Sequence, residues 1–221
     1  MTVKAHFAVI AGELAPGTTV SREQFSKVPD LIRASFQAVN RMTVEPGVLK
    51  YEILRMDEFM GLSENPLYAM RSLIMLIGAF RFLSFRELGI KIHLRASLGL
   101  GPVEFAGDLI RESDGTAFRN ASHGLEKMKR DQHLVIHPGE KKTEEEFNLT
   151  CRFMDILIRN LSDEQSEALF LSLSGKNQSE ISQMLGISQP AVNRRLKAAN
   201  AQVIQKFIAR YETLLKPLLR S

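Results

Sequence analysis

Residues 178–197 of the chain have the sequence QSEISQMLGISQPAVNRRLK. The pattern predicts a short helix over Gln178–Leu185, a tight turn at Gly186, and a second helix that begins after Ser188. Glycine has no Cβ and reaches positive φ at little cost, which suits it to the turn. Ser188 is a good N-cap, and Pro190 falls in the first helical turn, where its missing N–H costs nothing. The stretch is therefore predicted to form a helix-turn-helix.

The apolar and polar residues of this stretch separate into two sets. The apolar positions that such a motif needs between its helices are Ile181, Leu185, Ile187, Val192 and Leu196. The remaining positions of the second helix are predicted to face outward, and among them Gln189 and Asn193 have amides that pair with adenine, whereas Arg194 suits guanine. The second helix is therefore the predicted recognition helix of a motif that binds double-stranded DNA.

The charge around the motif favours the same interpretation. Between Glu180 and Glu212 there is no acidic residue, whereas that interval holds five basic ones. An interval with charges of one sign indicates a polyanionic partner, although a helical hairpin with a basic solvated face is the plain alternative. The predicted DNA-binding residues are Ser188, Gln189, Asn193, Arg194, Arg195, Lys197 and Lys206.

From Leu161 onward, the segment LSDEQSEALFLSLSGKNQSEISQMLGISQPAVNRRLKAA resembles two known helix-turn-helix families. These are the LuxR-type regulators and region four of the sigma factors. The resemblance implies DNA binding through the helix that starts at Gln189, without identifying an operator.

The composition of the whole chain is that of a soluble globular protein. It has 221 residues, of which 44% are hydrophobic and 24% charged, and a formal net charge of +4. Its one cysteine, Cys151, excludes an internal disulfide, fits a reducing cytoplasm, and is expected to be a core thiol. The longest apolar run, residues 73–80, is too short to cross a bilayer, so we expect a cytoplasmic protein with no membrane partner.

The first 137 residues alternate between strand and helix patterns. Strands are predicted at residues 7–11, 49–54, 56–62, 90–99 and 132–137. Helices are predicted after Ser21 with a kink at Pro29, from Asn65 to about Glu87, and after Gly115 through Lys129. This order is the βαββαβ arrangement of a ferredoxin-like or palm-type α/β sandwich, with an added helix and strand. The predicted fold class is therefore α+β, with an all-α helix-turn-helix domain after the sandwich.

The charged segment KKTEEE at residues 141–146 has no apolar period and is interpreted as a link that leads into a helix from Glu144 to Asn160. We place the domain boundary there, with an α/β domain for ligand sensing or dimerisation over residues 1–142 and a helical DNA-binding domain over residues 143–221.

The C-terminal tail is apolar at Val203, Ile204, Phe207, Ile208, Tyr211, Leu214, Leu215 and Leu218. Two roles remain open for this tail: it forms the seam of a homodimer, or it packs back on the α/β domain.

Four segments of the N-terminal part together resemble the SatD-like proteins: VIAGEL (9–14), MDEFMGL (56–62), IHLRASLGLGPV (92–103) and DGTAFRNASHGLEKMK (114–129). That pattern is in turn similar to the palm-type folds of class III nucleotide cyclases and GGDEF domains. In those relatives, carboxylates on the first strand and in the central hairpin hold divalent metal that binds nucleotide phosphates. By this resemblance, Glu13, Asp57, Glu58 and Asp114 are candidate ligands for Mg²⁺ or a nucleotide. The sequence departs from the family pattern after Glu13, where Leu14 and Ala15 replace the second carboxylate.

Three function classes follow from these observations. The first is a bacterial, cytoplasmic transcriptional regulator that acts as a homodimer, because a single helix-turn-helix reads few base pairs. The second is a nucleotide-processing, cyclase-like enzyme that the helical domain targets. The third is a protein-interaction module whose helical hairpin binds an acidic surface. We favour the regulator and expect no catalytic residues.

Overall fold

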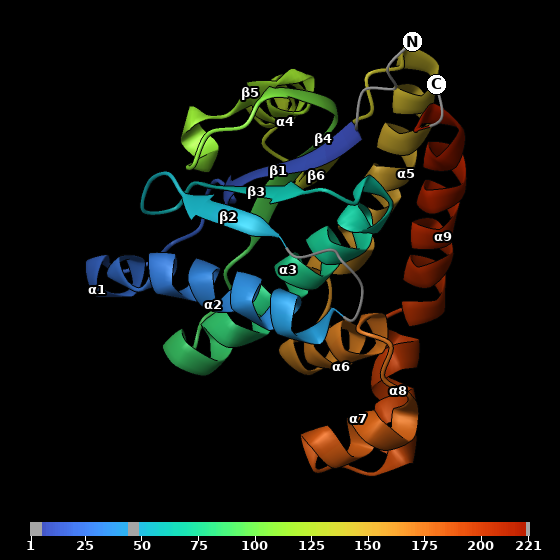
Figure 1. The fold of residues 1–221 in the computed structure, drawn as a ribbon. Coiled ribbons are helices and arrows are strands. Elements are labelled where there is room, and N and C mark those ends of the chain that lie inside the picture. Colours follow the sequence, from blue (N-terminus) through green and yellow to red (C-terminus); the bar gives the residue numbers. More distant parts are fainter. Residues whose placement is uncertain (1–5, 44–48, 220–221) are drawn as a thin grey trace.

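The computed structural model describes residues 6–43 and 49–219. Its N-terminal part alternates strands with helices (Figure 1), in the order β1 (His6–Leu14), α1 (Arg22–Ser26), α2 (Val28–Met42), β2 (Lys50–Ile53), β3 (Phe59–Ser63), α3 (Pro66–Leu88), β4 (Leu94–Phe105), β5 (Asp114–Gly115), α4 (Thr116–Lys127) and β6 (Leu134–His137). A 3-10 turn at Ile110–Glu112 precedes β5. The C-terminal part is helical, with α5 (Lys141–Arg159), α6 (Asp163–Leu173), α7 (Gln178–Leu185), α8 (Gln189–Ala198) and α9 (Ala201–Leu218). This composition confirms the predicted α+β class.

The strands form one curled sheet whose main part has the order β2-β3-β1-β4, and each neighbouring pair in it is antiparallel. This is the strand order of the ferredoxin-like βαββαβ sandwich. β4 is long enough to have two partners on its outer side. Residues 96–99 of β4 pair in parallel with β6, and β5 pairs in antiparallel with the end of β4 near Val103. The parallel β4-α4-β6 unit is the helix and strand that the sequence predicted in addition to the sandwich.

Helices cover both faces of the sheet, which leaves β1 buried on both sides (Figure 1). Ala8 and Ile10 belong to the large core shared with α2 and α3, whereas Val9 and Ala11 belong to a smaller core under α4. Successive strand residues point to opposite faces, so a strand between two cores has no polar side. This explains the continuous apolar run that predicted a buried central strand at residues 7–11.

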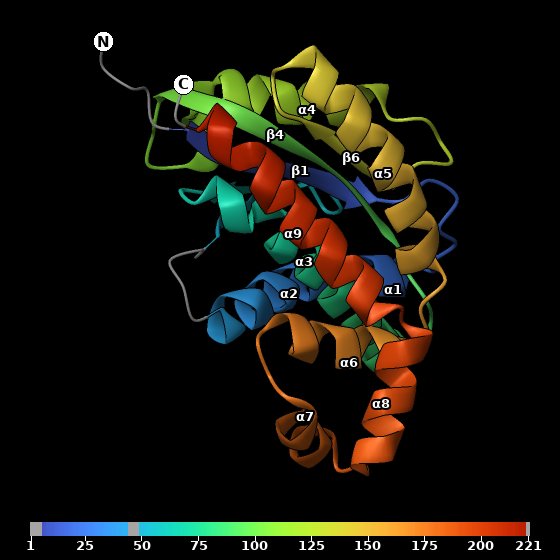
Figure 2. The ribbon, with the colours of Figure 1, turned by 90° about the vertical axis from the view of Figure 1, so that its right-hand side faces the viewer.

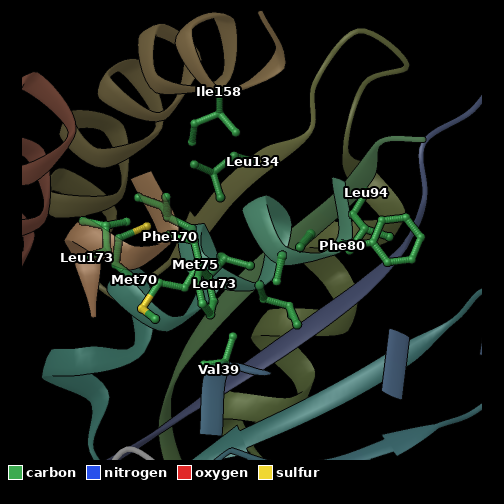
Figure 3. Packing of buried hydrophobic residues seen from close by; sticks show 14 of the residues in the cluster. Val39, Met70, Leu73, Met75, Phe80, Leu94, Leu134, Ile158, Phe170 and Leu173 are labelled. Atoms are coloured by element: carbon green, nitrogen blue, oxygen red, sulfur yellow. The ribbon is translucent and has the colours of Figure 1, made fainter. Parts of the chain in front are cut away.

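The C-terminal helices continue the large core instead of forming a separate one. Figure 3 shows Met70 and Leu73 of α3 near Phe170 and Leu173 of α6. Helix α9 packs against α3 and α5, and in the view of Figure 2 it passes in front of α3. Its buried residues are Ala201, Ile204, Phe207, Ile208, Tyr211 and Leu215. Of the two roles left open for the apolar tail, the structure shows the second, because the buried side of α9 packs back on the rest of the chain.

Most predicted elements differ in their bounds by a few residues, and for three of them the structure gives a local reason. The helix after Ser21 is divided into α1 and α2, since Pro29 has no N–H for the carbonyl one turn earlier. Helix α5 begins at Lys141, before the predicted Glu144, and a carboxylate oxygen of Glu140 accepts a hydrogen bond from the backbone N–H of Thr143 at 2.8 Å. Strand β4 continues to Phe105, because Pro102 falls between the stretches that pair with β6 and β5, where a strand tolerates proline.

By length and composition alone, helix α3 is long and apolar enough to cross a membrane. However, 72% of its most apolar 18-residue stretch is buried inside the protein. Its buried side chains include Met70, Leu73, Met75 and Phe80 (Figure 3). Burial on this scale is that of a central core helix and is consistent with a soluble protein.

Candidate nucleic-acid interface

The helix-turn-helix lies at the end of the molecule away from the sheet (Figures 1 and 2), and local capping defines both of its helices. Asn177 caps α7, because its side-chain oxygen accepts hydrogen bonds from the N–H groups of Ser179 and Glu180 at 2.9 and 3.0 Å. Glu180 completes the capping box by accepting from the N–H of Asn177 at 2.8 Å. The predicted bounds of the first helix, Gln178–Leu185, are confirmed.

The turn and the start of α8 also follow the sequence. Gly186 ends α7 with a φ of 63°, which is the left-handed conformation that favours glycine. Ser182 holds the turn from both sides, since its carbonyl accepts from the N–H of Ile187 at 3.1 Å and its hydroxyl donates to the Ile187 carbonyl at 2.6 Å. Ser188 caps α8 by accepting from the N–H of Ala191 at 3.4 Å. The turn is therefore fixed by hydrogen bonds within the motif.

The predicted apolar contacts orient the two helices. Ile181 and Val192 are fully buried, and Leu185, Ile187 and Leu196 pack partly buried against the same core. Because Val192 and Leu196 lie on one side of α8, the opposite side of that helix is left to solvent.

The exposed side of α8 is polar and basic. Gln189, Arg194 and Lys197 are exposed, and Asn193 is half-buried. Helical spacing places Arg194 opposite the buried Val192, with Lys197 one turn further along on the same side. This face has hydrogen-bonding groups for base edges and positive charge for phosphates.

Arg195 and Lys206 flank this face. Arg195 is half-buried and lies within electrostatic range of Glu164 at the start of α6. The pKa of Glu164 is lowered mainly by a hydrogen bond from the Ser162 hydroxyl at 2.7 Å, with a further contribution from Arg195. Lys206 is exposed on α9, one helical turn before Arg210, whose guanidinium binds Glu146 of α5 at 3.0 Å. Lys206 therefore remains available to a partner at the edge of the motif, whereas part of the Arg195 charge is offset within the chain.

A groove that the sequence did not predict lies beside the recognition helix. Its walls come from the end of α6, the start of α7, the end of α8 and the start of α9, and its lining includes Lys176, Asn177, Asn193, Lys197, Asn200 and Gln205. Two of these residues, Asn193 and Lys197, belong to the predicted DNA-binding set. The capping box at Asn177-x-x-Glu180 signals where α7 begins, but nothing in the sequence indicates that this helix end meets α8 and α9.

The carboxylates proposed for metal or nucleotide are only partly brought together. Glu13 and Glu58 line one groove, because Gly12 and Phe59 are paired between β1 and β3. Arg95 donates from Nε to Glu13 at 2.6 Å, and Arg55 pairs with Glu58 at 3.1 Å. Both carboxylates thus already have a cationic partner, which reduces their need for a metal ion.

The other two candidate ligands lie elsewhere. Asp57 sits in the turn between β2 and β3 and is not among the residues that line the groove. Asp114 pairs with Phe105 on β4, at the opposite end of the sheet from Glu13, and both its oxygens accept from Arg119 at 2.9 Å. Within residues 6–43 and 49–219, no group of three or more His, Cys, Asp or Glu side chains is arranged to hold a metal ion.

The family model for region 4 of sigma-70 factors matches residues 156–202, from the last turn of α5 to the start of α9. This confirms the resemblance of the helix-turn-helix to sigma region four. No curated protein and no solved structure matches the chain. None of these comparisons supports the resemblance of the N-terminal part to SatD-like proteins, nucleotide cyclases or GGDEF domains.

Proposed function

We propose that this chain is a sequence-specific DNA-binding transcriptional regulator in which α8 enters the major groove. The observation that carries the proposal is the exposed face of α8, with Gln189, Arg194 and Lys197 in solvent on a motif that matches sigma-70 region 4. A helix-turn-helix that protrudes from its support can approach a duplex without a clash from the α/β part (Figure 1).

In this proposal the side chains of α8 divide into two roles. Gln189 and Asn193 pair with adenine and Arg194 pairs with guanine, because these side chains match the donor and acceptor pattern of those bases in the major groove. Lys197, Arg195 and Lys206 neutralise phosphates, and the Ser188 hydroxyl lies at the helix N-terminus, where a phosphate is also favoured. The base-reading residues set specificity, and the basic ones set affinity.

The remaining parts of the proposal concern the context of this activity. We place the protein in the bacterial cytoplasm, acting as two copies because one helix-turn-helix reads few base pairs. The described α/β part supports the C-terminal helices through the core that they share. Nothing in the groove at Glu13 and Glu58 favours a nucleotide-processing enzyme, since each carboxylate is paired with arginine.

The test is binding to random duplex DNA over a series of salt concentrations. We expect wild type to bind with a steep salt dependence, and the double variant Arg194→Ala with Lys197→Ala to lose affinity. Each phosphate contact that is lost flattens the log–log slope by about 0.9. The matched control is Lys127→Ala with Lys129→Ala, which removes two exposed charges at the end of α4 and is expected to leave binding unchanged. Absence of binding by wild type, or equal losses in both double variants, would refute the proposal.

A further inference from the structure

Helix α5 exposes a contiguous row of large apolar side chains. Leu149, Phe153 and Ile156 have relative exposures of 61%, 59% and 50%. Their spacing of four and then three residues places them on one side of the helix. Leu149 and Phe153 lie outside the segment that matches sigma-70 region 4, so the row is not a property of that match alone.

The opposite side of α5 is apolar as well. Phe147, Cys151, Met154 and Ile158 are buried in the large core. A helix at the surface of a monomer normally has a polar outer side, and a helix that is apolar on two sides is normally covered on both. The row at Leu149, Phe153 and Ile156 therefore has the character of an interface.

The charges beside the row identify what covers it. Glu145 is exposed at the N-terminal end of the row, Arg152 is exposed beside its middle, and Arg159 lies at its C-terminal end. Neither Glu145 nor Arg152 has a hydrogen bond or ion pair within the described parts of the chain. Arg159 contacts Asp155 through Nε at 3.2 Å, and its side chain is still 38% exposed. A helix that is acidic at one end and basic at the other complements a copy of itself in the reverse direction, and the two helix dipoles then also oppose each other.

We propose that α5 pairs in an antiparallel direction with α5 of a second copy of this chain, around a two-fold axis near Arg152. In this pairing Leu149 and Ile156 of one copy contact Phe153 and its neighbours in the other, as knobs of a two-helix seam. Glu145 of each copy meets Arg159 of the other. Arg152 meets its own equivalent, at the solvent-exposed edge of the seam.

The direction of the pairing has a consequence for the helix-turn-helix. Because α5 leads into α6 at the end of the molecule that carries α7 and α8 (Figure 2), an antiparallel pair holds the two motifs at opposite ends of the dimer. Each copy then reads one half-site, and the length of the dimer sets the distance between the two half-sites. The dimer itself does not depend on the DNA-binding proposal and is tested without DNA.

The first experiment is sedimentation of the 221-residue chain over a range of protein concentrations. We expect wild type to approach twice the chain mass of 24.9 kDa, and Leu149→Glu with Phe153→Glu to remain at the monomer mass at concentrations at least about tenfold higher. Both positions are exposed, so these variants should keep the wild-type helical content by circular dichroism. Phe105→Glu is the control, because Phe105 is equally exposed, at 60%, but lies on β4.

The second experiment reports the direction of the helices. Single variants Arg152→Cys and Glu145→Cys are oxidised, with the native Cys151 buried and therefore silent. Antiparallel pairing predicts a disulfide-linked dimer for Arg152→Cys only, since residue 145 then lies about 20 Å from its equivalent, at 1.5 Å rise per residue. Cross-linking of both variants would overturn the antiparallel direction, and a wild-type chain that stays monomeric at all concentrations would overturn the proposal itself.

Discussion

The hydroxyl of Tyr211 donates a hydrogen bond of 2.6 Å to the backbone carbonyl of Pro66. Tyr211 is fully buried in the middle of α9, and Pro66 is the first residue of α3. The bond therefore connects the last helix of the chain to the central core helix. Burial also raises the pKa of the Tyr211 hydroxyl well above its ordinary value, which favours the protonated form that donates this bond.

Replacement of Tyr211 by Phe tests how strongly this bond joins the two parts of the chain. The ring still fills its place, but the donor is lost and the Pro66 carbonyl is left without it. We expect the free energy of unfolding to fall by about 0.5–1.5 kcal/mol, the net contribution of one buried hydrogen bond, since the Pro66 carbonyl still accepts a hydrogen bond within α3. Urea unfolding measures the change. Thr213→Val, which removes an exposed hydrogen bond on the same helix, should change stability by less than about 0.5 kcal/mol; an equal loss in both variants would contradict the expectation.

Gly99 allows α4 to lie directly on β4. A Cβ at this position would approach the backbone of α4, including the Ala121 Cα at 2.8 Å, and a backbone cannot move aside as a flexible side chain does. We expect Gly99→Ala to be among the most destabilising single changes, by more than about 3 kcal/mol.

The matched control is Gly78→Ala in the middle of α3. A Cβ there would meet only the Ser166 carbonyl oxygen at an ordinary 3.6 Å, and alanine is the better helix former. Thermal unfolding should show a large drop in Tm for Gly99→Ala and an unchanged or higher Tm for Gly78→Ala. The reverse order would contradict the close packing of α4 on β4.

His93 links stability to pH. Its pKa is lowered to about 4 by burial, and further by the positive charges of Arg81, His133 and Arg159, against an opposing effect of Asp155. The unfolded chain takes up this proton near pH 6.5, so more protons bind to the unfolded state and stability falls as the pH drops from about 6.5 to about 4. Above that window His93 is neutral in both states and contributes no pH dependence.

The variant His93→Gln should therefore lose less stability than wild type between about pH 7 and about pH 5. Urea midpoints at the two pH values measure the difference, and His6→Gln is the control for removal of a histidine outside this cluster. If wild type and His93→Gln lose the same stability over this range, another group is responsible.

The sequence predicts most of what depends on local chemistry. The helix-turn-helix follows from Gly186, Ser188 and the apolar spacing, and its first helix has the predicted bounds because capping acts over only a few residues. The buried Cys151 was also predicted, and burial raises the pKa of its thiol far above the ordinary range, which makes it unreactive.

Relationships between distant segments were harder to predict. The spacing of apolar residues on α9 is the same whether this helix packs on a second copy or on its own chain. Only the position of α3 in the fold decides between these two roles. Likewise, the pairing of Glu13 with Arg95 depends on the register of β1 and β4, which places these residues opposite each other. Asp57 and Asp114 were matched to a family pattern one residue at a time. Such matches do not reveal that both residues lie away from the groove at Glu13.

A substitution at Arg194 can distinguish the recognition of a base from the contribution of positive charge in the proposed interface. Arginine binds guanine through two parallel hydrogen bonds, whereas lysine keeps the charge but presents a single ammonium group. We expect Arg194→Lys to weaken binding to the selected operator by about tenfold to a hundredfold, while affinity for random DNA and its salt slope stay as in wild type. Lys197→Arg is the control, because a residue that contacts phosphate accepts either cation. Titrations of both variants against operator and random duplexes decide the matter: if Arg194→Lys weakens binding to both duplexes equally, Arg194 contacts the DNA backbone instead of a base.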